Sequence, residues 1–395
     1  MIPTFSHRIN QDSSSLDELF KLSAQANKIS FAGGYPDPNL FPKDELKRAF
    51  EKRINDESND LFQYRTVTGY EPLRQKIASS TKKMGFDCSS EEIMLTQGAQ
   101  QGIKLLSSLF LDDHDGIAVE APTYVGALEA FNEHLPKYYE IPMEKDGMDL
   151  ETLENTLQHN KIKIIYTIPN FQNPTGYCMS TIKRKRLAAL AAKYQAVVIE
   201  DDPYRELRYE GSALPAIKSF DRTGNVITLG SFSKILSPAL RCGWLIASPE
   251  IVKQLSSLRL SYDCQSSNVL LESIDQYLGE NSIEKHIDHL RRAYRLKMQT
   301  MLTCLEDELP TDCSFSHPQG GFFIWVTLPQ GCDAAILLKQ TNIVTFLEGS
   351  SLFANSSPKN YIRLNFTGVS LSEIKKGCAD LGEAIKYSLV NQFAI

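Results

Sequence analysis

The chain has 395 residues, of which 42% are hydrophobic and 23% are charged, and its formal net charge is −6. This length predicts roughly two to three domains. No basic block marks a nucleic-acid binder, and no apolar run is long enough to cross a membrane. The eight cysteines lack the two-residue gap of zinc sites, and the first residues lack a secretory signal pattern. We therefore expect a cytoplasmic enzyme with small-molecule partners, with no nucleic acid and no membrane among them.

Turn-forming residues dominate the first part of the chain, where Gly33-Gly34-Tyr35 is followed by Pro36 and Pro38. Glycine and proline at this density argue against a core element. We expect residues 1–45 to form an N-terminal arm that packs on another surface.

Strand-like apolar runs alternate with helical segments between about residues 90 and 250. The runs cover residues 93–96, 117–120, 162–168, 196–200, 226–229 and 244–247. This alternation predicts an α/β fold whose mostly parallel sheet is covered by helices on both faces. Ligands of such sheets bind beyond the carboxyl ends of the strands. We assign this large domain to residues 46–282.

The pattern changes after residue 282. A long helix ends near Leu309, strand-like segments follow at 320–329 and 361–366, and a closing helix covers 372–390. This mixture predicts a second, smaller α+β domain at residues 283–395. His286 and His289 lie one turn apart in the long helix, but its amphipathic pattern favours a solvated face over a metal pair, so no metal site is predicted.

Lys234 follows the strand-like run 226–229, in the sequence Gly230-Ser-Phe-Ser-Lys234. A lysine just past a strand could attack an aldehyde if its pKa is lowered. The alternative is a surface lysine in a polar loop. Arg241 could pair with a phosphate, to which Ser231 and Ser233 would donate hydrogen bonds.

Asp201 and Asn173 follow two further strands. Asp201 lies in Glu200-Asp-Asp-Pro-Tyr204, and a carboxylate at a buried strand end suits the protonated ring nitrogen of a cofactor. A helix cap by Asp201 or Asp202 is the alternative. Asn173, stiffened by Pro174, offers an amide donor to a phenolate oxygen, although an ordinary turn would also explain this sequence.

Two more strand ends carry candidate ligand contacts. Gln97-Gly98-Ala99-Gln100-Gln-Gly opens a helix after 93–96, and free N–H groups at a helix start bind anions. An ordinary strand-to-helix turn is the alternative. Tyr124, after the run 117–120, could stack on a heteroaromatic ring or be a core tyrosine.

In this order, the motifs resemble those of a pyridoxal 5'-phosphate enzyme of the aspartate-aminotransferase fold, in the aminotransferase class I and II family. The resemblance runs from residues 31–38 through 63–69 to 361–366. The arm, Gln-Gly-Ala-Gln-Gln-Gly and Pro-Gln-Gly-Gly-Phe-Phe-Ile-Trp-Val are most similar to the 2-aminoadipate and kynurenine aminotransferase branch. This branch shares its fold with the effector domain of MocR-type regulators. The resemblance implies fold type I, an arm that contributes to the small domain and the substrate pocket, and a homodimer with a shared active site.

The resemblance also implies the roles of the site residues. Lys234 would hold the cofactor as a Schiff base and move the Cα proton, and Asp201 would pair with the ring nitrogen. Asn173 and Tyr204 would hydrogen-bond the 3-oxygen, and Tyr124 would stack on the ring. The phosphate contacts would be Gly98, Ala99, Gln100, Ser231, Ser233, Arg241 and Tyr64 of the partner subunit, with Ala99 standing where relatives commonly have serine. The substrate contacts would be Arg363, which would bind the α-carboxylate, and Asn173, together with Gly34 and Tyr35 of the arm.

The implied reaction is the ping-pong transfer of an amino group from an L-amino acid to a 2-oxo acid such as 2-oxoglutarate. Because no second arginine is evident for a side-chain carboxylate, aromatic, 2-aminoadipate-like or large aliphatic donors are favoured over aspartate. Elimination or decarboxylation with the same cofactor is one alternative. A MocR-like effector-binding protein without catalytic activity is another, disfavoured because the resemblance begins within about 30 residues of Met1.

Overall fold

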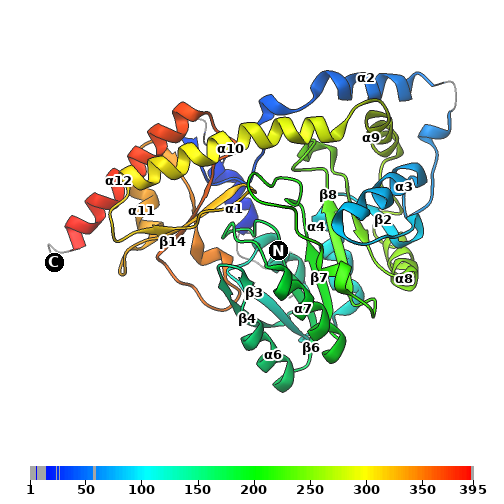
Figure 1. The fold of residues 1–395 in the computed structure, drawn as a ribbon, viewed down its shortest axis with the longest axis horizontal. Helices are drawn as coiled ribbons and strands as arrows, with labels where there is room; N and C mark the ends of the chain where they lie inside the picture. The colour runs from blue at the N-terminus through cyan, green and yellow to red at the C-terminus, as the bar shows by residue number, and fades with distance from the viewer. Residues whose placement is uncertain (1–5, 7–14, 24, 26, 57–58, 393–395) are drawn as a thin grey trace, which may run out of the picture.

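An eight-stranded sheet forms the centre of the larger part of the molecule (Figure 1). The computed structural model describes residues 6, 15–23, 25, 27–56 and 59–392. In spatial order the strands are β2 (Ile93–Thr96), β9 (Gly243–Ile246), β8 (Val226–Ser231), β7 (Val197–Asp201), β6 (Ile162–Thr167), β3 (Gly116–Ala121), β4 (Lys137–Glu144) and β5 (Gly147–Met148). Strands β8, β7, β6, β3 and β4 run parallel, whereas β9 is antiparallel to both of its neighbours. The carboxyl ends of β2, β8, β7, β6 and β3 therefore meet at one edge, which confirms the expected α/β sheet.

The central strands are apolar on both faces because both faces are covered. Along β6, Ile164 and Tyr166 pack into one core cluster, and Ile165 between them packs into another. The helices of the first cluster include α4 (Ala99–Phe110), α5 (Val125–Asn132) and α8 (Pro249–Leu260), and those of the second are α6 (Leu150–His159) and α7 (Thr181–Tyr194). Two-sided burial explains why these strands read as continuous apolar runs.

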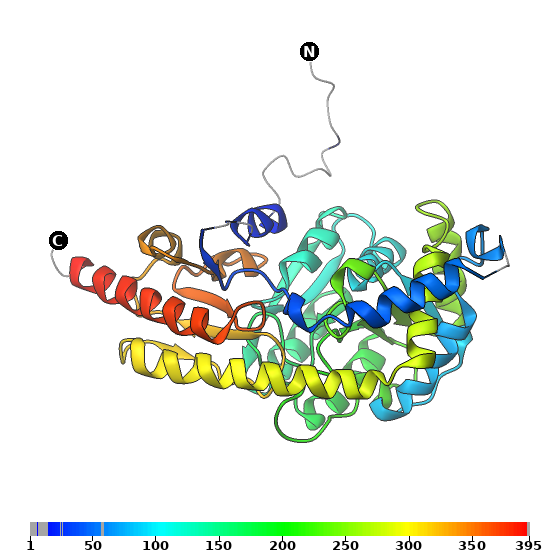
Figure 2. The same ribbon diagram turned by 90° about the horizontal axis from the view of Figure 1, so that it is seen from above.

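A second, antiparallel sheet lies beside the first, with the strand order β10-β11-β14-β13. Its strands are β10 (Ser314–Phe315), β11 (Phe323–Thr327), β14 (Tyr361–Asn365) and β13 (Leu347–Glu348). The long helix α10 (Ile283–Glu308) runs from α9 (Asn268–Glu280) to pack along α12 (Leu371–Gln392), as Figure 2 shows in yellow and red. Helix α11 (Ala334–Gln340) completes this part. The domain boundaries after residues 45 and 282 stay predictions.

The arm contains regular structure that its turn-rich sequence did not suggest. It holds α1 (Ser15–Ser23), β1 (Ile29–Ser30) and the start of α2 (Lys43–Ile54), which packs on α9. Strand β1 pairs in parallel with β12 (Val344–Thr345), and the N–H of Phe31 donates to Thr345 O at 2.8 Å. Phe31 and Ala32 have no exposed surface. The expectation that this segment lacks core residues was therefore wrong here, because pairing with β12 carries two apolar side chains into the interior.

The short helical segment η2 (Asn59–Phe62) precedes α3 (Glu71–Ser80), and further short segments are η1 (Pro38–Leu40), η3 (Thr81–Met84), η4 (Ser90–Glu92), η5 (Ile217–Phe220), η6 (Pro238–Leu240) and η7 (Gly349–Leu352). Among all helices that the structure describes, none has the length and apolar character that crossing a bilayer requires.

Candidate active site

Lys234 lies three residues beyond β8, at the shared edge of the large sheet. Its Nζ donates to the carbonyl oxygen of Gly34 at 2.9 Å and stands 5.6 Å from the ring centroid of Phe322. Burial, and then the cations of Arg363 and Arg241, lower the pKa of this amine to about 8. Neutral amine, the nucleophilic form, is therefore accessible near neutral pH.

Asp201 is the last residue of β7 and is 3% exposed. The register that pairs Asp201 with Leu229 places it beside the end of β8, which leads to Lys234. Its Oδ2 accepts a hydrogen bond from Tyr166 Oη at 2.7 Å, while Oδ1 is buried without a partner. Burial raises the pKa of Asp201 to about 7, although Tyr166 and Lys234 act in the opposite direction. A buried, unpartnered carboxylate oxygen is costly unless a ligand donates to it.

Arg363 enters the site from β14 and is 1% exposed. Its Nη1 donates to Asn173 Oδ1 at 2.8 Å and its Nη2 to Ala32 O at 2.5 Å, while Nε has no partner. The guanidinium carbon lies 4.2 Å from the ring centroid of Phe323. Burial lowers the pKa of Arg363 to about 10, so the side chain stays cationic at neutral pH.

Two tyrosines complete the group around Lys234. Burial raises the pKa of Tyr124 to about 12 and holds the pKa of Tyr204 well above its usual range. Both hydroxyls therefore remain protonated at neutral pH and can donate hydrogen bonds. The Tyr204 ring packs against Phe322 and Phe323, at centroid distances of 5.4 and 5.9 Å. Asp201 and Arg363 both act electrostatically on Tyr124 and Tyr204, which places these predicted residues in one cluster with Lys234.

The predicted phosphate contacts gather where α4 begins. Gly98 precedes the helix with φ of +83°, and Arg241 Nη2 donates to Gln97 O at 2.9 Å. A Cβ built on Gly98 would lie 2.9 Å from Arg241 Nη2, so only glycine leaves this space open. Gln100 Nε2 donates to Gly126 O at 2.5 Å, and its buried Oε1 has no partner. A helix N-terminus beside an arginine is suited to an anion.

The two serines and Ala99 lie close to these contacts. Ser231 Oγ donates to Ser233 Oγ at 2.9 Å, and both serines are buried. Ala99 is the first residue of α4 and offers only its backbone N–H. The last residue of β8 and the segment after it thus present hydroxyls at the same edge of the sheet as Lys234.

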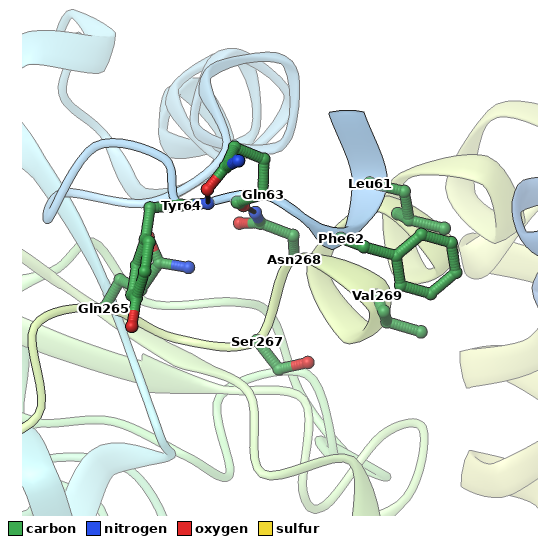
Figure 3. A pocket seen from close by; sticks show the side chains of 8 residues that line it. All are labelled: Leu61, Phe62, Gln63, Tyr64, Gln265, Ser267, Asn268 and Val269. Carbon is green, nitrogen blue, oxygen red and sulfur yellow. Dashed lines mark hydrogen bonds between the residues drawn. The ribbon is translucent and has the colours of Figure 1, made fainter. Parts of the chain in front are cut away.

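Tyr64 does not join this cluster within one chain. It is 79% exposed and borders a surface hollow of about 240 Å³ (Figure 3). The hollow is lined by Leu61, Phe62, Gln63, Tyr64, Gln265, Ser267, Asn268 and Val269. Tyr35 is 41% exposed and stacks on Phe20 of α1, with ring centroids 6.5 Å apart. Gly34 reaches Lys234 through its carbonyl oxygen alone.

Our sequence analysis missed three buried residues that hold the site in place. Tyr166 contacts Asp201, as described above. Glu120 Oε2 accepts from Gln172 Nε2 at 3.1 Å, and Gln172 Oε1 accepts from the N–H of Thr175 at 2.8 Å, which ties down the loop carrying Asn173. A polar group inside an otherwise apolar strand was the available signal, since a buried tyrosine hydroxyl usually finds a partner.

Comparison with known proteins identifies the family. The model of the family described as aminotransferase class I and II matches residues 28–381. The chain belongs to the aminotransferase class I and II family. It is therefore an enzyme that transfers amino groups, and its cofactor is pyridoxal 5'-phosphate.

Three relatives cover nearly the whole chain. Aromatic-amino-acid aminotransferase 1 of Thermococcus litoralis is 37% identical over 96% of this chain and 93% of its own length. The 2-aminoadipate transaminase of Thermus thermophilus is 35% identical over 94% of each chain. The crystal structure of Pyrococcus horikoshii kynurenine aminotransferase superposes with a TM-score of 0.92 at 38% identity, covering 98% of this chain and 97% of that one. This aminotransferase is thus similar to enzymes named for aromatic amino acids, 2-aminoadipate and kynurenine.

The residues of the cluster fit pyridoxal phosphate. Asp201 offers a buried oxygen without a donor, Lys234 offers an amine of lowered pKa, and Gly98 leaves space against Arg241. These three features match the ring nitrogen, the aldehyde and the phosphate of the cofactor.

Proposed function

We propose that this aminotransferase moves the amino group of an aromatic, 2-aminoadipate-like or large aliphatic L-amino acid to a 2-oxo acid such as 2-oxoglutarate. Lys234, Asp201 and Tyr204 are its catalytic residues in this proposal. The observation that carries it is one cluster in which a lysine of lowered pKa, an unpartnered buried carboxylate oxygen and a buried arginine interact. The named relatives favour transamination over elimination, decarboxylation or effector binding alone.

Each residue around the cofactor has a distinct chemical role in this proposal. When bound, pyridoxal phosphate supplies an aldehyde that exchanges amines and a ring that accepts the electrons left when the Cα proton departs. Lys234 Nζ accepts that proton and later releases it, which its pKa near 8 permits. Asp201 keeps the ring nitrogen protonated, while Tyr204 and Asn173 donate to the ring oxygen and Tyr124 packs on the ring.

The remaining contacts bind two anions. Arg363 offers its guanidinium fork to the α-carboxylate, together with Asn173. The phosphate contacts are Gly98, Ala99, Gln100, Ser231, Ser233 and Arg241, with Tyr64 of the partner subunit. Each charge-assisted hydrogen bond contributes about 1.5–3 kcal/mol, so several together retain the cofactor between half-reactions.

An apolar cluster supports the proposed class of amino donor. Ala32, whose carbonyl oxygen accepts from Arg363, packs in one cluster with Val125, Trp325 and Leu352. Tyr124 and Phe353 border this cluster, and Trp325 stacks on Tyr361 with centroids 5.2 Å apart. The partly buried Tyr124, Phe353 and Tyr361 at its border would offer apolar contacts to an aromatic or aliphatic substrate side chain. Gly34 and Tyr35 of the arm would contact the same substrate side chain.

Exposed aromatic residues support a homodimer. Phe62, Tyr64 and Tyr262 are 66%, 79% and 53% exposed, and exposed apolar surface of this kind favours a protein interface. A second copy covering it would bring Tyr64 to the partner's cofactor. No disulfide links the eight cysteines, all of which the structure describes, which agrees with the proposed cytoplasmic location.

A spectroscopic titration tests the reaction. The purified enzyme with bound cofactor should lose its visible absorption band when an aromatic amino acid is added and regain it with 2-oxoglutarate, which appears as glutamate. Lys234→Ala should remove both the band and the turnover, whereas the control Lys253→Ala, at an exposed lysine of α8, should keep both. Release of pyruvate and ammonia in place of glutamate formation would establish elimination instead.

A further inference from the structure

We propose that Tyr166 is the positioning residue of Asp201, holding one carboxylate oxygen so that the other is presented to the ring nitrogen of the cofactor. This inference rests on the proposed function of Asp201. It concerns the next-to-last residue of β6, a central strand of the large sheet.

The geometry gives Asp201 two unequal oxygens. Tyr166 Oη donates to Oδ2 at 2.7 Å, and Oδ1 is buried without a partner. A rotation of the carboxylate by 180° exchanges two chemically equivalent oxygens, but any smaller rotation breaks the hydrogen bond to Tyr166. The hydrogen bond therefore fixes the rotation angle of the carboxylate, with one oxygen toward Tyr166 and the other toward the ligand.

Tyr166 is itself held rigidly. It has no exposed surface, and its ring meets Phe131 edge-on at a centroid distance of 5.7 Å. Burial and the neighbouring Asp201 keep the pKa of the Tyr166 hydroxyl well above its usual range, so this group stays a donor at every working pH. A fixed donor in a dry site costs no reorganisation when the ligand arrives.

Several titratable groups face Asp201 from the surrounding elements. They are Tyr166 in β6, Glu120 in β3, Tyr124 before α5, Lys234 after β8, and Asp202 and Tyr204 following Asp201 in the chain. Of these, Tyr166 alone has a hydrogen bond to the Asp201 carboxylate among the described residues. Its loss should raise the pKa of Asp201, because a donor to a carboxylate favours the charged form.

The test compares two cofactors in the Tyr166→Phe variant. One is pyridoxal phosphate, and the other is its 1-deaza analogue, in which a carbon replaces the ring nitrogen. We expect Tyr166→Phe to bind pyridoxal phosphate roughly 10-fold more weakly, and the deaza analogue as tightly as the unmodified protein does. When the affinity for pyridoxal phosphate is measured against pH, it should fall at low pH as Asp201 is protonated. The midpoint of this fall, the acid limb of the curve, should move up by about one pH unit in the variant.

A matched control removes another tyrosine hydroxyl from the same sheet. Tyr139 in β4 donates to Asn160 Oδ1 at 2.9 Å, away from Asp201, so Tyr139→Phe should leave both affinities and the acid limb unchanged. Equal weakening of both cofactors in Tyr166→Phe, or no weakening of either, would overturn the proposal by leaving Tyr166 a structural role only.

A second variant keeps the test decisive if Tyr166→Phe does not fold. Tyr166→3-fluorotyrosine retains the ring and makes the hydroxyl a stronger hydrogen-bond donor to Asp201. The acid limb of pyridoxal phosphate binding should therefore move to lower pH. An acid limb at unchanged pH would overturn the inference. Failure of the proposed role of Asp201 is distinguishable, because the unmodified protein would then bind pyridoxal phosphate and the deaza analogue equally tightly.

Discussion

Burial shifts the pKa values of three ionisable side chains of the site in the direction that disfavours their charged forms. The pKa of Lys234 is lowered to about 8, that of Arg363 is lowered to about 10, and that of Asp201 is raised to about 7. Two cations with one partly protonated acid leave a net positive site. Such a site favours ligands that bring negative charge, as a phosphate and an α-carboxylate do.

The reactivity of Lys234 should follow the pKa set by these neighbours. In the protein without cofactor, attachment of pyridoxal phosphate should accelerate as pH rises and level off above about 8, because roughly one tenth of the amine is neutral at pH 7. Arg363→Met removes the larger of the two cationic effects on Lys234, so the midpoint should move to higher pH and attachment at pH 7 should slow. Stopped-flow absorption measures both rates. Arg222→Met, at an exposed arginine, is the control, and an unshifted midpoint in Arg363→Met would contradict this account.

At the scale of elements, the sequence predicted the sheet edge well because parallel strands end together. The runs ending at Thr96, Glu120 and Leu229 lie within β2, β3 and β8, and their following residues do gather at one edge. The reversed direction of β9 was not predictable, since a buried apolar strand reads the same in either direction. Tyr166 carried only the signal of a polar group in an apolar strand, because its position in the strand matches a core residue and its partner lies on another strand.

The turn before α4 should be tested at Gly98. A Cβ there would lie 2.9 Å from Arg241 Nη2, in a backbone conformation with φ of +83°. Gly98→Ala should weaken pyridoxal phosphate binding by roughly 10-fold, the value of one lost charge-assisted hydrogen bond, but leave the reaction of Lys234 with phosphate-free pyridoxal unchanged. The matched control is Gly224→Ala, which has φ of +82° and nothing within 4 Å of the added Cβ. Equal losses with both aldehydes would show general damage to the fold.

At the scale of the whole molecule, the site depends on parts of the chain that lie far apart in sequence. Lys234 follows the large sheet, Gly34 belongs to the arm, and Arg363 comes from the second sheet. Local sequence patterns predicted each element but not the contacts between these distant segments. Those contacts depend on the pairing of β1 with β12 and of β14 with its neighbours. The family resemblance supplied Arg363 and Tyr64, whose roles nothing in their own sequence surroundings would indicate.

The shared active site can be tested with hybrid dimers in which the two subunits carry different substitutions. If Tyr64 serves the partner's cofactor, a hybrid dimer of Lys234→Ala and Tyr64→Ala subunits contains one site with both defects and one with neither. Co-expression of the two variants with different affinity tags should then yield hybrids with one fully active site, about one quarter of all sites when subunits pair at random. Tyr64→Ala dimers alone should retain the cofactor roughly 10-fold less tightly.

The control for this experiment pairs two defects that act within one chain. A hybrid of Lys234→Ala with Asp201→Asn should show no recovery, because each of its sites keeps one defect. Recovery of activity and cofactor affinity in the Tyr64 hybrid but not in the Asp201 hybrid requires Tyr64 to cross the interface. If the Tyr64 hybrid shows only the weak binding of its Tyr64→Ala parent, Tyr64 acts within its own subunit or not at all, and its 79% exposure in the single chain needs another explanation.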